Sequence, residues 1–285
     1  MRRTGTVFLL LLILFLPISA SADTGPKPSV RIAFTGGEGL TFYGTLLSRY
    51  DSTGPASAWN GQEEYASYHP GEEGYEVWRK FVDYKDADGF YFLQEWWDCS
   101  ENQALNWIYY PPSTFKILLY FPDSDTFCIS PVYEKYAFDS YYTADLSQWE
   151  SGTLSAVRSY DYTGEILALA ARIVLTIALE LLVAFCFGYR GKRVFALLAV
   201  VNVVTQVFLN VFLNVVHYRS GPWDFTFCYV FLELIVFLLE AWIYAERLPR
   251  MDGTRRIRAV GYAFVANLLS FVAGLALAFW LPTLF

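Results

Sequence analysis

The sequence predicts an α+β membrane protein, in which a β-rich extracytoplasmic domain with one or two helices precedes a four-helix transmembrane bundle. Three observations predict this fold class. A charged N-terminus leads into an apolar run, about 140 residues then show strand-like alternation, and four apolar segments fill the last 120 or so residues. Each of these four segments is close to the ~20 residues that are needed to cross the hydrocarbon layer of a membrane.

The first 22 residues have the organisation of a secretory signal peptide. Arg2 and Arg3 form the charged region, residues 7–16 are an unbroken apolar run, and Ala20-Ser21-Ala22 is a small-residue cleavage site. The apolar run is short for a membrane span. We expect cleavage after Ala22, with an uncleaved anchor as the alternative, so that residue 23 begins the part outside the cytoplasm.

Residues 23–163 are long enough for one domain with its own hydrophobic core. Apolar and polar residues alternate in several runs, and Pro-Asp-Ser-Asp at 122–125 is typical of a tight turn between two strands. A helix is expected where aromatic residues recur at helical spacing after Tyr75. The predicted elements are strands at 30–34, 40–47, 90–97, 105–110, 115–121, 126–130 and 133–142, a helix at 73–84 and a surface loop at 60–71.

This domain is strongly acidic. It carries 21 Asp and Glu against 9 Lys and Arg, a net charge of −12, whereas the whole chain has a net charge of −7. A negative surface is a poor ligand for nucleic acid or for anionic lipid, and it attracts cations and basic peptides. Asp86-Ala87-Asp88-Gly89 resembles the start of a calcium loop, but Phe90 and Trp97 stand where further ligands are required. We therefore predict a plain turn there.

The four cysteines divide evenly between the two parts of the chain. Cys99 and Cys128 lie in the acidic domain, where an oxidising exterior would allow a disulfide between them. Their spacing leaves open whether the two Cβ atoms approach each other. Cys186 and Cys228 lie in the apolar segments, where we expect them to pack as small apolar side chains rather than to bind a metal.

The four predicted spans are about 165–187, 194–217, 225–245 and 258–281, within a transmembrane domain at 164–285. Basic residues are concentrated in two of the links. Residues 189–193 hold two Arg and one Lys and residues 247–258 hold five Arg, whereas residues 218–224 hold Arg219 alone. The positive-inside rule then places the two basic links in the cytoplasm, and residues 23–163 and the C-terminus outside. This orientation predicts a multi-pass protein of the plasma membrane.

Each span carries a polar stripe, because residues four and seven positions apart share one face of a helix. Ionisable groups in hydrocarbon are costly and mark pairs or pathways. We expect Arg172 to pair with Glu233, Asn202 to bond Asn267, and Glu180 or Glu240, or both, to be protonated or to hold a cation. The alternatives are that the stripes only join the helices, or that they contact a partner in the membrane. The candidate polar core is formed by Arg172, Glu180, Asn202, Gln206, Asn210, Glu233, Glu240 and Asn267.

The sequence offers little support for an enzyme. It has two histidines, His69 and His217, and lacks the metalloprotease, serine-hydrolase, P-loop and dinucleotide-binding motifs. Two distant histidines and scattered cysteines do not supply a zinc site. A pair of membrane carboxyl groups, Glu180 with Glu240, is the one arrangement that would allow an intramembrane enzyme. We predict no catalytic, cofactor-binding or metal-binding residues and no cofactor.

Several segments resemble a group of membrane proteins from Gram-positive, clostridia-type bacteria. These segments are Tyr43-Gly44-Thr45-Leu46-Leu47 with Ser52-Thr53-Gly54-Pro55, Asn202-Val203-Val204-Thr205-Gln206 with Asn210, Glu233-Leu234-Ile235-Val236 with Glu240, and Ala266-Asn267 with Ser270 and Gly274. The resemblance covers the chain as a whole. It implies a signal peptide, an aromatic exterior domain, four C-terminal spans and a location in the cell envelope, and it assigns no catalytic role.

These observations favour a non-enzymatic function. We expect an envelope sensor or accessory subunit that binds a ligand or partner outside the cell and acts through another membrane protein. The alternative is a small proton- or cation-coupled transporter that uses Glu180, Glu233 and Glu240. The expected contacts are membrane lipid, a membrane protein partner or further copies of this chain, and an extracellular ligand, but no nucleic acid.

Overall fold

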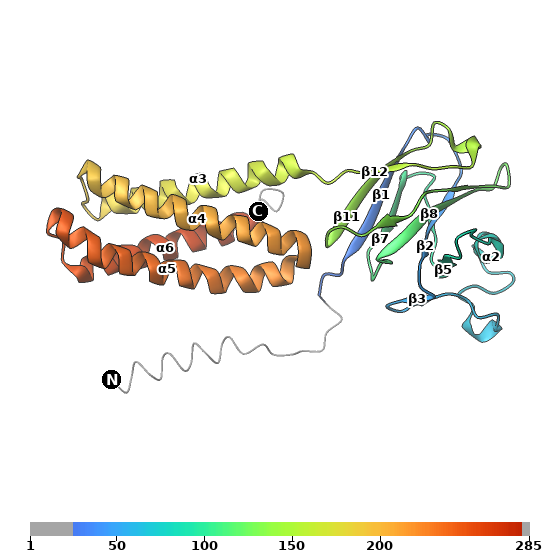
Figure 1. Ribbon diagram of the computed structural model, residues 1–285, viewed down its shortest axis with the longest axis horizontal. Helices are drawn as coiled ribbons and strands as arrows, with labels where there is room; N and C mark the ends of the chain where they lie inside the picture. The colour runs from blue at the N-terminus through green and yellow to red at the C-terminus, as the bar shows by residue number, and fades with distance from the viewer. Residues whose placement is uncertain (1–24, 281–285) are drawn as a thin grey trace.

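The computed structural model describes residues 25–280 and has the predicted fold class, a β-rich domain followed by four long apolar helices (Figure 1). The strands lie within residues 29–158, and the helices begin at Tyr162. The domain sits at one end of the helices (Figure 1). The predicted signal peptide and the predicted position of the last four residues fall outside the described residues.

The first sheet of the domain has the strand order β12-β11-β1-β7. Its central strand β1 is parallel to β11 and antiparallel to β7. Val30, Ile32 and Phe34 are buried while Arg31 and Ala33 are exposed, so the alternation in the sequence correctly marks one core-facing side. The strands are β1 (Ser29–Thr35), β7 (Ala104–Trp107), β11 (Asp139–Asp145) and β12 (Ala156–Arg158).

The second sheet is built around β8 (Thr114–Phe121), which is buried on both faces. Phe115 and the alternate residues after it join the core shared with the first sheet, and Leu118 and Tyr120 face the helix α2 (Tyr75–Asp83). The domain thus has three layers: sheet, sheet and helix. The other strands are β2 (Tyr43–Ser48), β5 (Tyr91–Phe92), β6 (Trp97–Asp98), β9 (Thr126–Ile129) and β10 (Tyr133–Glu134), with a separate hairpin of β3 (Ser52–Thr53) and β4 (Ala56–Ser57) and short 3-10 turns η1 (Glu63–Tyr65) and η2 (Trp149–Ser151).

The predicted strand at 90–97 is wrong, because the chain turns in its middle. Gln94 has a left-handed backbone with φ of +65°. Its side-chain amide donates to the carbonyl oxygens of Ser57 (3.1 Å) and Tyr65 (3.2 Å) and accepts from the amide of Ser67 (3.0 Å). The Gln94 side chain therefore holds the loop around η1 in place by hydrogen bonds. The predicted strand is reduced to two short strands, β5 before Gln94 and β6 after it.

The predicted strand at 133–142 is also wrong, since it divides between the two sheets. β10 pairs with β8, whereas β11 pairs with β1 and β12. The buried Ser140 side chain closes the turn between them by accepting from the amides of Tyr136 (3.0 Å) and Ala137 (3.1 Å). A single serine hydroxyl thus replaces the ladder bonds that a continuous strand would make.

The turn at Asp86 and Asp88 holds a buried lysine. Lys116 of β8 is 5% exposed, and its Nζ lies 2.8 Å from Asp86 Oδ1 and 2.5 Å from Asp88 Oδ2. Burial disfavours the charged forms, but the bonds between the groups outweigh it, so the pKa of Asp86 is lowered and the pKa of Lys116 is raised. The two aspartates of the calcium-like sequence therefore neutralise an internal cation.

We predict that Asp86→Asn lowers the free energy of unfolding by about 1–3 kcal/mol at pH 7, because Lys116 then keeps only the exposed Asp88 carboxylate as a counter-ion. The lowered pKa of Asp86 means that its contribution exists above the ordinary aspartate pKa and is lost as the pH falls through the folded value. The raised pKa of Lys116 preserves the pair up to at least pH 10.5. The difference between wild type and variant should therefore shrink in acid.

Denaturation of the full chain in detergent, followed by tryptophan fluorescence, measures this effect. Asp83→Asn is the matched control, since it breaks the exposed Arg79–Asp83 pair and should cost under about 1 kcal/mol. Equal losses in the two variants would contradict the buried pair.

The disulfide considered between Cys99 and Cys128 is not formed, and both residues are buried free thiols. Cys128 lies opposite Leu119, and Leu119 lies opposite Gly44, beside which the Cys99 sulfur packs. Two strands, β8 and β2, thus lie between the two cysteines. At the usual strand spacing this separation exceeds about 9 Å, which is too far for a disulfide. Burial raises the pKa of Cys99 to about 12 and that of Cys128 to about 11.

We predict that neither thiol reacts with iodoacetamide in the native protein at pH 8, because almost no thiolate is present at these pKa values. The measurement is mass spectrometry of a Cys186→Ser, Cys228→Ser variant before and after denaturation. Two added groups are expected only after denaturation. An intact mass two hydrogens lower than that of the dithiol would mean that the disulfide forms after all.

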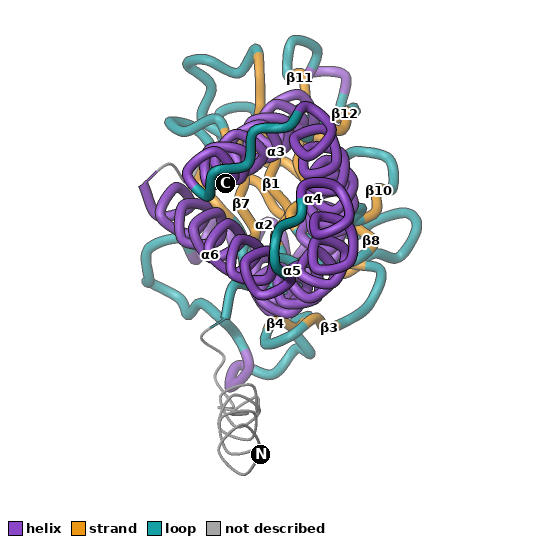
Figure 2. Tube along the Cα trace, turned by 90° about the vertical axis from the view of Figure 1, so that its left-hand side faces the viewer, coloured by secondary structure: helices purple, strands orange, loops and turns teal. Residues whose placement is uncertain are grey.

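The four helices are α3 (Tyr162–Cys186), α4 (Lys192–Ser220), α5 (Pro222–Asp252) and α6 (Arg256–Trp280). All four are long and apolar enough to cross a membrane. Each helix packs against the next and α3 packs against α6, which closes the ring seen along the bundle in Figure 2. Large apolar side chains such as Val204, Phe208 and Leu238 remain exposed on the outside of this ring, as expected for a multi-pass membrane protein.

Candidate functional site

Most of the polar residues predicted from the stripes lie inside the bundle. On α4 the buried positions follow one another at intervals of three and four residues, which directs a single face toward the other helices. Arg172 and Glu233 are half-buried. The residues that are at most 8% exposed are Glu180, Asn202, Gln206, Asn210, Glu240 and Asn267 from the predicted set, together with Thr205 and Ser270.

Glu240 of α5 is fully buried, and both of its carboxyl oxygens are hydrogen bonded. Thr205 Oγ1 of α4 donates to Oε1 at 2.6 Å, and Asn267 Nδ2 of α6 donates to Oε2 at 2.8 Å. Three helices therefore meet at one carboxyl group. Thr205 was not among the predicted residues, although it lies three positions from Asn202 and so on the same side of α4.

Glu180 of α3 is also fully buried, but its environment differs. Asn202 of α4 and Ser270 of α6 face its carboxyl group, and Glu240 is near enough to repel it when both are charged. Neither oxygen of Glu180 has a hydrogen-bond partner in the protein, and the same holds for both polar atoms of the Asn202 side chain. The expected Asn202–Asn267 bond is therefore absent, because the Asn267 amide is directed to Glu240 instead.

Arg172 lies in a different layer of the bundle. Its guanidinium donates to Asn214 Oδ1 of α4 at 3.0 Å. Glu233 interacts with the hydroxyl of Tyr229, four residues before it on α5. Asn214 and Tyr229 thus complete this layer, and the pairing of Arg172 with Glu233 stays a prediction. Between the two layers, Asn210 Nδ2 donates to the carbonyl and side-chain oxygens of Gln206 at 2.9 and 3.1 Å.

An aromatic junction joins the β-rich domain to the bundle. The amide of Phe138, in the turn before β11, donates to the carbonyl oxygen of Tyr218 near the end of α4 at 2.8 Å. The Tyr218 ring packs edge-on against Tyr160, with ring centroids 5.2 Å apart. A Cβ atom on Gly221 would lie 2.6 Å from the Phe138 ring, so the ring rests directly on this glycine. The sequence did not reveal this junction, because its partners are 80 residues apart.

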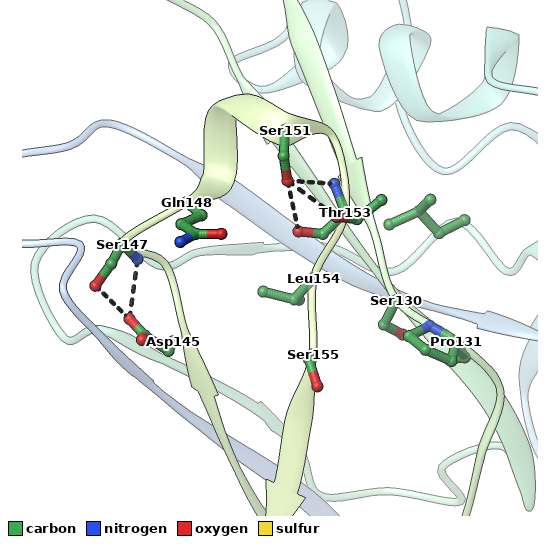
Figure 3. A pocket seen from close by; sticks show the side chains of 10 residues that line it. Ser130, Pro131, Asp145, Ser147, Gln148, Ser151, Thr153, Leu154 and Ser155 are labelled. Carbon is green, nitrogen blue, oxygen red and sulfur yellow. Dashed lines mark hydrogen bonds between the residues drawn. The ribbon is translucent and has the colours of Figure 1, made fainter.

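The β-rich domain also has a shallow pocket of about 730 Å³ beside η2, shown in Figure 3. Its lining is rich in hydroxyl groups. Ser147 bonds Asp145 at 2.6 Å, and Ser151 bonds Thr153 at 2.9 Å. Because these groups are already hydrogen bonded to one another, they stabilise the loop and present few free donors to a ligand. The unpartnered groups of the bundle are the stronger candidate for a site.

Comparison of the chain with protein-family models, curated proteins and solved structures gave no match. The arguments for function therefore rest on the residues and their geometry.

We predict that Asn267→Leu lowers the stability of the bundle by about 1–3 kcal/mol, because it leaves one oxygen of Glu240 buried and unpaired. Reversible unfolding in mixed micelles containing dodecyl sulfate measures the change. The double variant Asn267→Leu, Glu240→Leu removes both partners and should recover most of the loss. A double variant that loses as much as the two single variants together would contradict the interaction.

Proposed function

We propose that this chain is an envelope sensor or accessory subunit, whose acidic β-rich domain binds a ligand or partner outside the cell and whose bundle passes the event to another membrane protein. The observation that carries the proposal is the aromatic junction. A domain held only by a flexible linker could not influence the helices, whereas Phe138 is hydrogen bonded to α4 and packed on Gly221. A change in the orientation of the domain would therefore reach α4 and α5 directly.

The arrangement of charge supports the orientation that the proposal needs. The domain adjoins the start of α3. The two basic segments, 189–193 and 247–258, contain the links from α3 to α4 and from α5 to α6 together with the adjoining helix ends, and they lie at the other end of the bundle (Figure 1). The positive-inside rule favours a cytoplasmic location for this basic end, and hence an exterior location for the domain. Within residues 25–280 both basic links are short. We infer that the output passes to another membrane protein.

A second candidate function is proton- or cation-coupled transport. The observation that favours it is the pair of fully buried carboxyl groups, Glu180 and Glu240, at the centre of the bundle. Proton and ion flux into vesicles that contain the purified protein tests this reading. Unchanged flux in a Glu233→Gln, Glu240→Gln variant and in a Glu180→Gln variant would rule out this candidate function.

The proposed function is tested by purifying the full chain from native membranes in mild detergent and identifying what co-purifies in stoichiometric amount. A defined membrane protein partner is expected for a sensor or accessory subunit. A homogeneous assembly of this chain alone would count against the proposal and favour transport.

We predict that Gly221→Ala loosens the junction. The alanine must adopt a φ of +88°, and its Cβ would overlap the Phe138 ring. Backbone strain costs about 1–2 kcal/mol, and overpacking adds about 1–3 kcal/mol. Hydrogen exchange of the full chain should show faster exchange at the Phe138 amide, with the helices still protected.

Gly253→Ala is the matched control for this experiment. It also follows a helix with a positive φ, of +74°, but nothing lies near its added Cβ. It should leave exchange at residue 138 unchanged. Equal exchange at that amide in wild type and Gly221→Ala would show that the junction does not hold the domain.

A further inference from the structure

Three side chains from three helices form a group that the protein itself leaves without hydrogen bonds. Glu180 of α3 and Asn202 of α4 are 0% exposed, and Ser270 of α6 is 8% exposed. Asn202 and Ser270 face the Glu180 carboxyl group. The polar atoms without a hydrogen-bond partner are Glu180 Oε1 and Oε2, Asn202 Oδ1 and Nδ2, Ser270 Oγ, the Tyr244 hydroxyl and, one turn before Ser270, Asn267 Oδ1.

Such a group is expensive in a bundle surrounded by lipid. A buried polar atom without a partner costs about 1–3 kcal/mol, and a charged one costs more. In the neighbouring Glu240 this cost is avoided, because Oε1 accepts a hydrogen bond from Thr205 and Oε2 accepts one from Asn267. Glu180 lies in the same part of the bundle, but the Asn202 and Ser270 side chains that face it do not reach hydrogen-bond geometry with its oxygens.

The group contains neutral donors and acceptors and one carboxyl group, but no positive charge from the described residues lies beside Glu180. Arg172 is eight residues before Glu180 on α3, about 12 Å along the helix axis, and it donates to Asn214 in the other polar layer. A proton on Glu180 would satisfy one carboxyl oxygen and one acceptor, and several oxygens would still lack a partner. A metal cation can be bound by several of these oxygens at once.

The charge and the donor types favour a monovalent metal ion. One carboxylate without donors is balanced by one positive charge, and the remaining ligands are neutral amide and hydroxyl oxygens. Divalent ions usually take several carboxylates, and within the described residues no three His, Cys, Asp or Glu are close enough to share a metal. Hard alkali-metal ions prefer oxygen ligands, as Ca²⁺ and Mg²⁺ do.

We propose that Glu180, Asn202 and Ser270, with the amide oxygen of Asn267, form an occluded binding site for one monovalent metal cation. This site is independent of the proposed sensing function, because it depends only on the interior of the bundle. Tyr244 and Tyr262 are fully buried, and Tyr262 donates to the carbonyl oxygen of Glu180 at 3.3 Å. These large side chains close the site toward the basic end of the bundle.

The test is a titration of the full-length protein in detergent with NaCl, at constant ionic strength maintained by choline chloride. A ligand at 100 times its Kd should raise the Tm by roughly 3–8 °C, in a saturable way. Equilibrium binding of radioactive sodium should give about one ion per chain. Parallel titrations with KCl and LiCl establish which alkali ion binds most tightly.

The variants distinguish a site from a general salt effect. Glu180→Gln should abolish sodium binding and the rise in Tm, and Ser270→Ala, which keeps the carboxylate, should raise the Kd about tenfold. Glu233→Gln is the matched control, because it removes a carboxyl group from the other polar layer of the bundle and should leave sodium binding unchanged.

Three results would overturn the proposal. One is an equal Tm in all the chloride salts, which would indicate screening only. Another is sodium binding that persists in Glu180→Gln. The third is a protein whose Tm responds to pH through Glu180 but which binds no alkali ion at any pH, since Glu180 would then be a protonation site alone.

Discussion

The hydrogen bonding of Glu240 is the interaction on which the bundle depends most. In hydrocarbon a polar group has no water to replace a lost partner, so each carboxyl group must be satisfied from within the protein. Glu240 meets this requirement with Thr205 and Asn267, which come from the helices on either side of α5. These two bonds fix the rotation and the depth of three helices at once, whereas lipid-facing valines and phenylalanines would tolerate many rotations.

The same constraint explains which parts of the site could be predicted. The helical spacing of polar residues shows which face of each span points inward, and Glu180, Asn202, Gln206, Asn210, Glu240 and Asn267 are all buried. Spacing does not identify the partner of each residue. The amide of Asn267 reaches Glu240 rather than Asn202 because of the rotation of α6 against α5, which depends on packing along the whole length of both helices.

In the β-rich domain, sequence patterns within one element predicted that element correctly, whereas contacts between residues far apart in the sequence could not be predicted. The hairpin of β8 and β9 follows from alternation and turn chemistry, and α2 follows from its aromatic periodicity. The interruptions at Gln94 and Ser140 depend on hydrogen bonds to loops. Asp86 and Asp88 neutralise Lys116, which lies in an apolar strand about 30 residues after them. The sequence around the two aspartates does not show this pairing.

Helix α4 is the element that both functional features share. It carries Tyr218 at the aromatic junction and Asn202 beside Glu180, 16 positions apart, or about 24 Å of continuous helix. A packed helix moves as a unit, so a rotation that favours the docked position of Phe138 on Tyr218 also changes the position of Asn202. If a cation holds Asn202 against Glu180, it favours one orientation of α4. The cation would then raise the affinity of the domain for any external ligand that prefers the same orientation. By linkage, that ligand would raise the affinity of the bundle for the cation by the same factor.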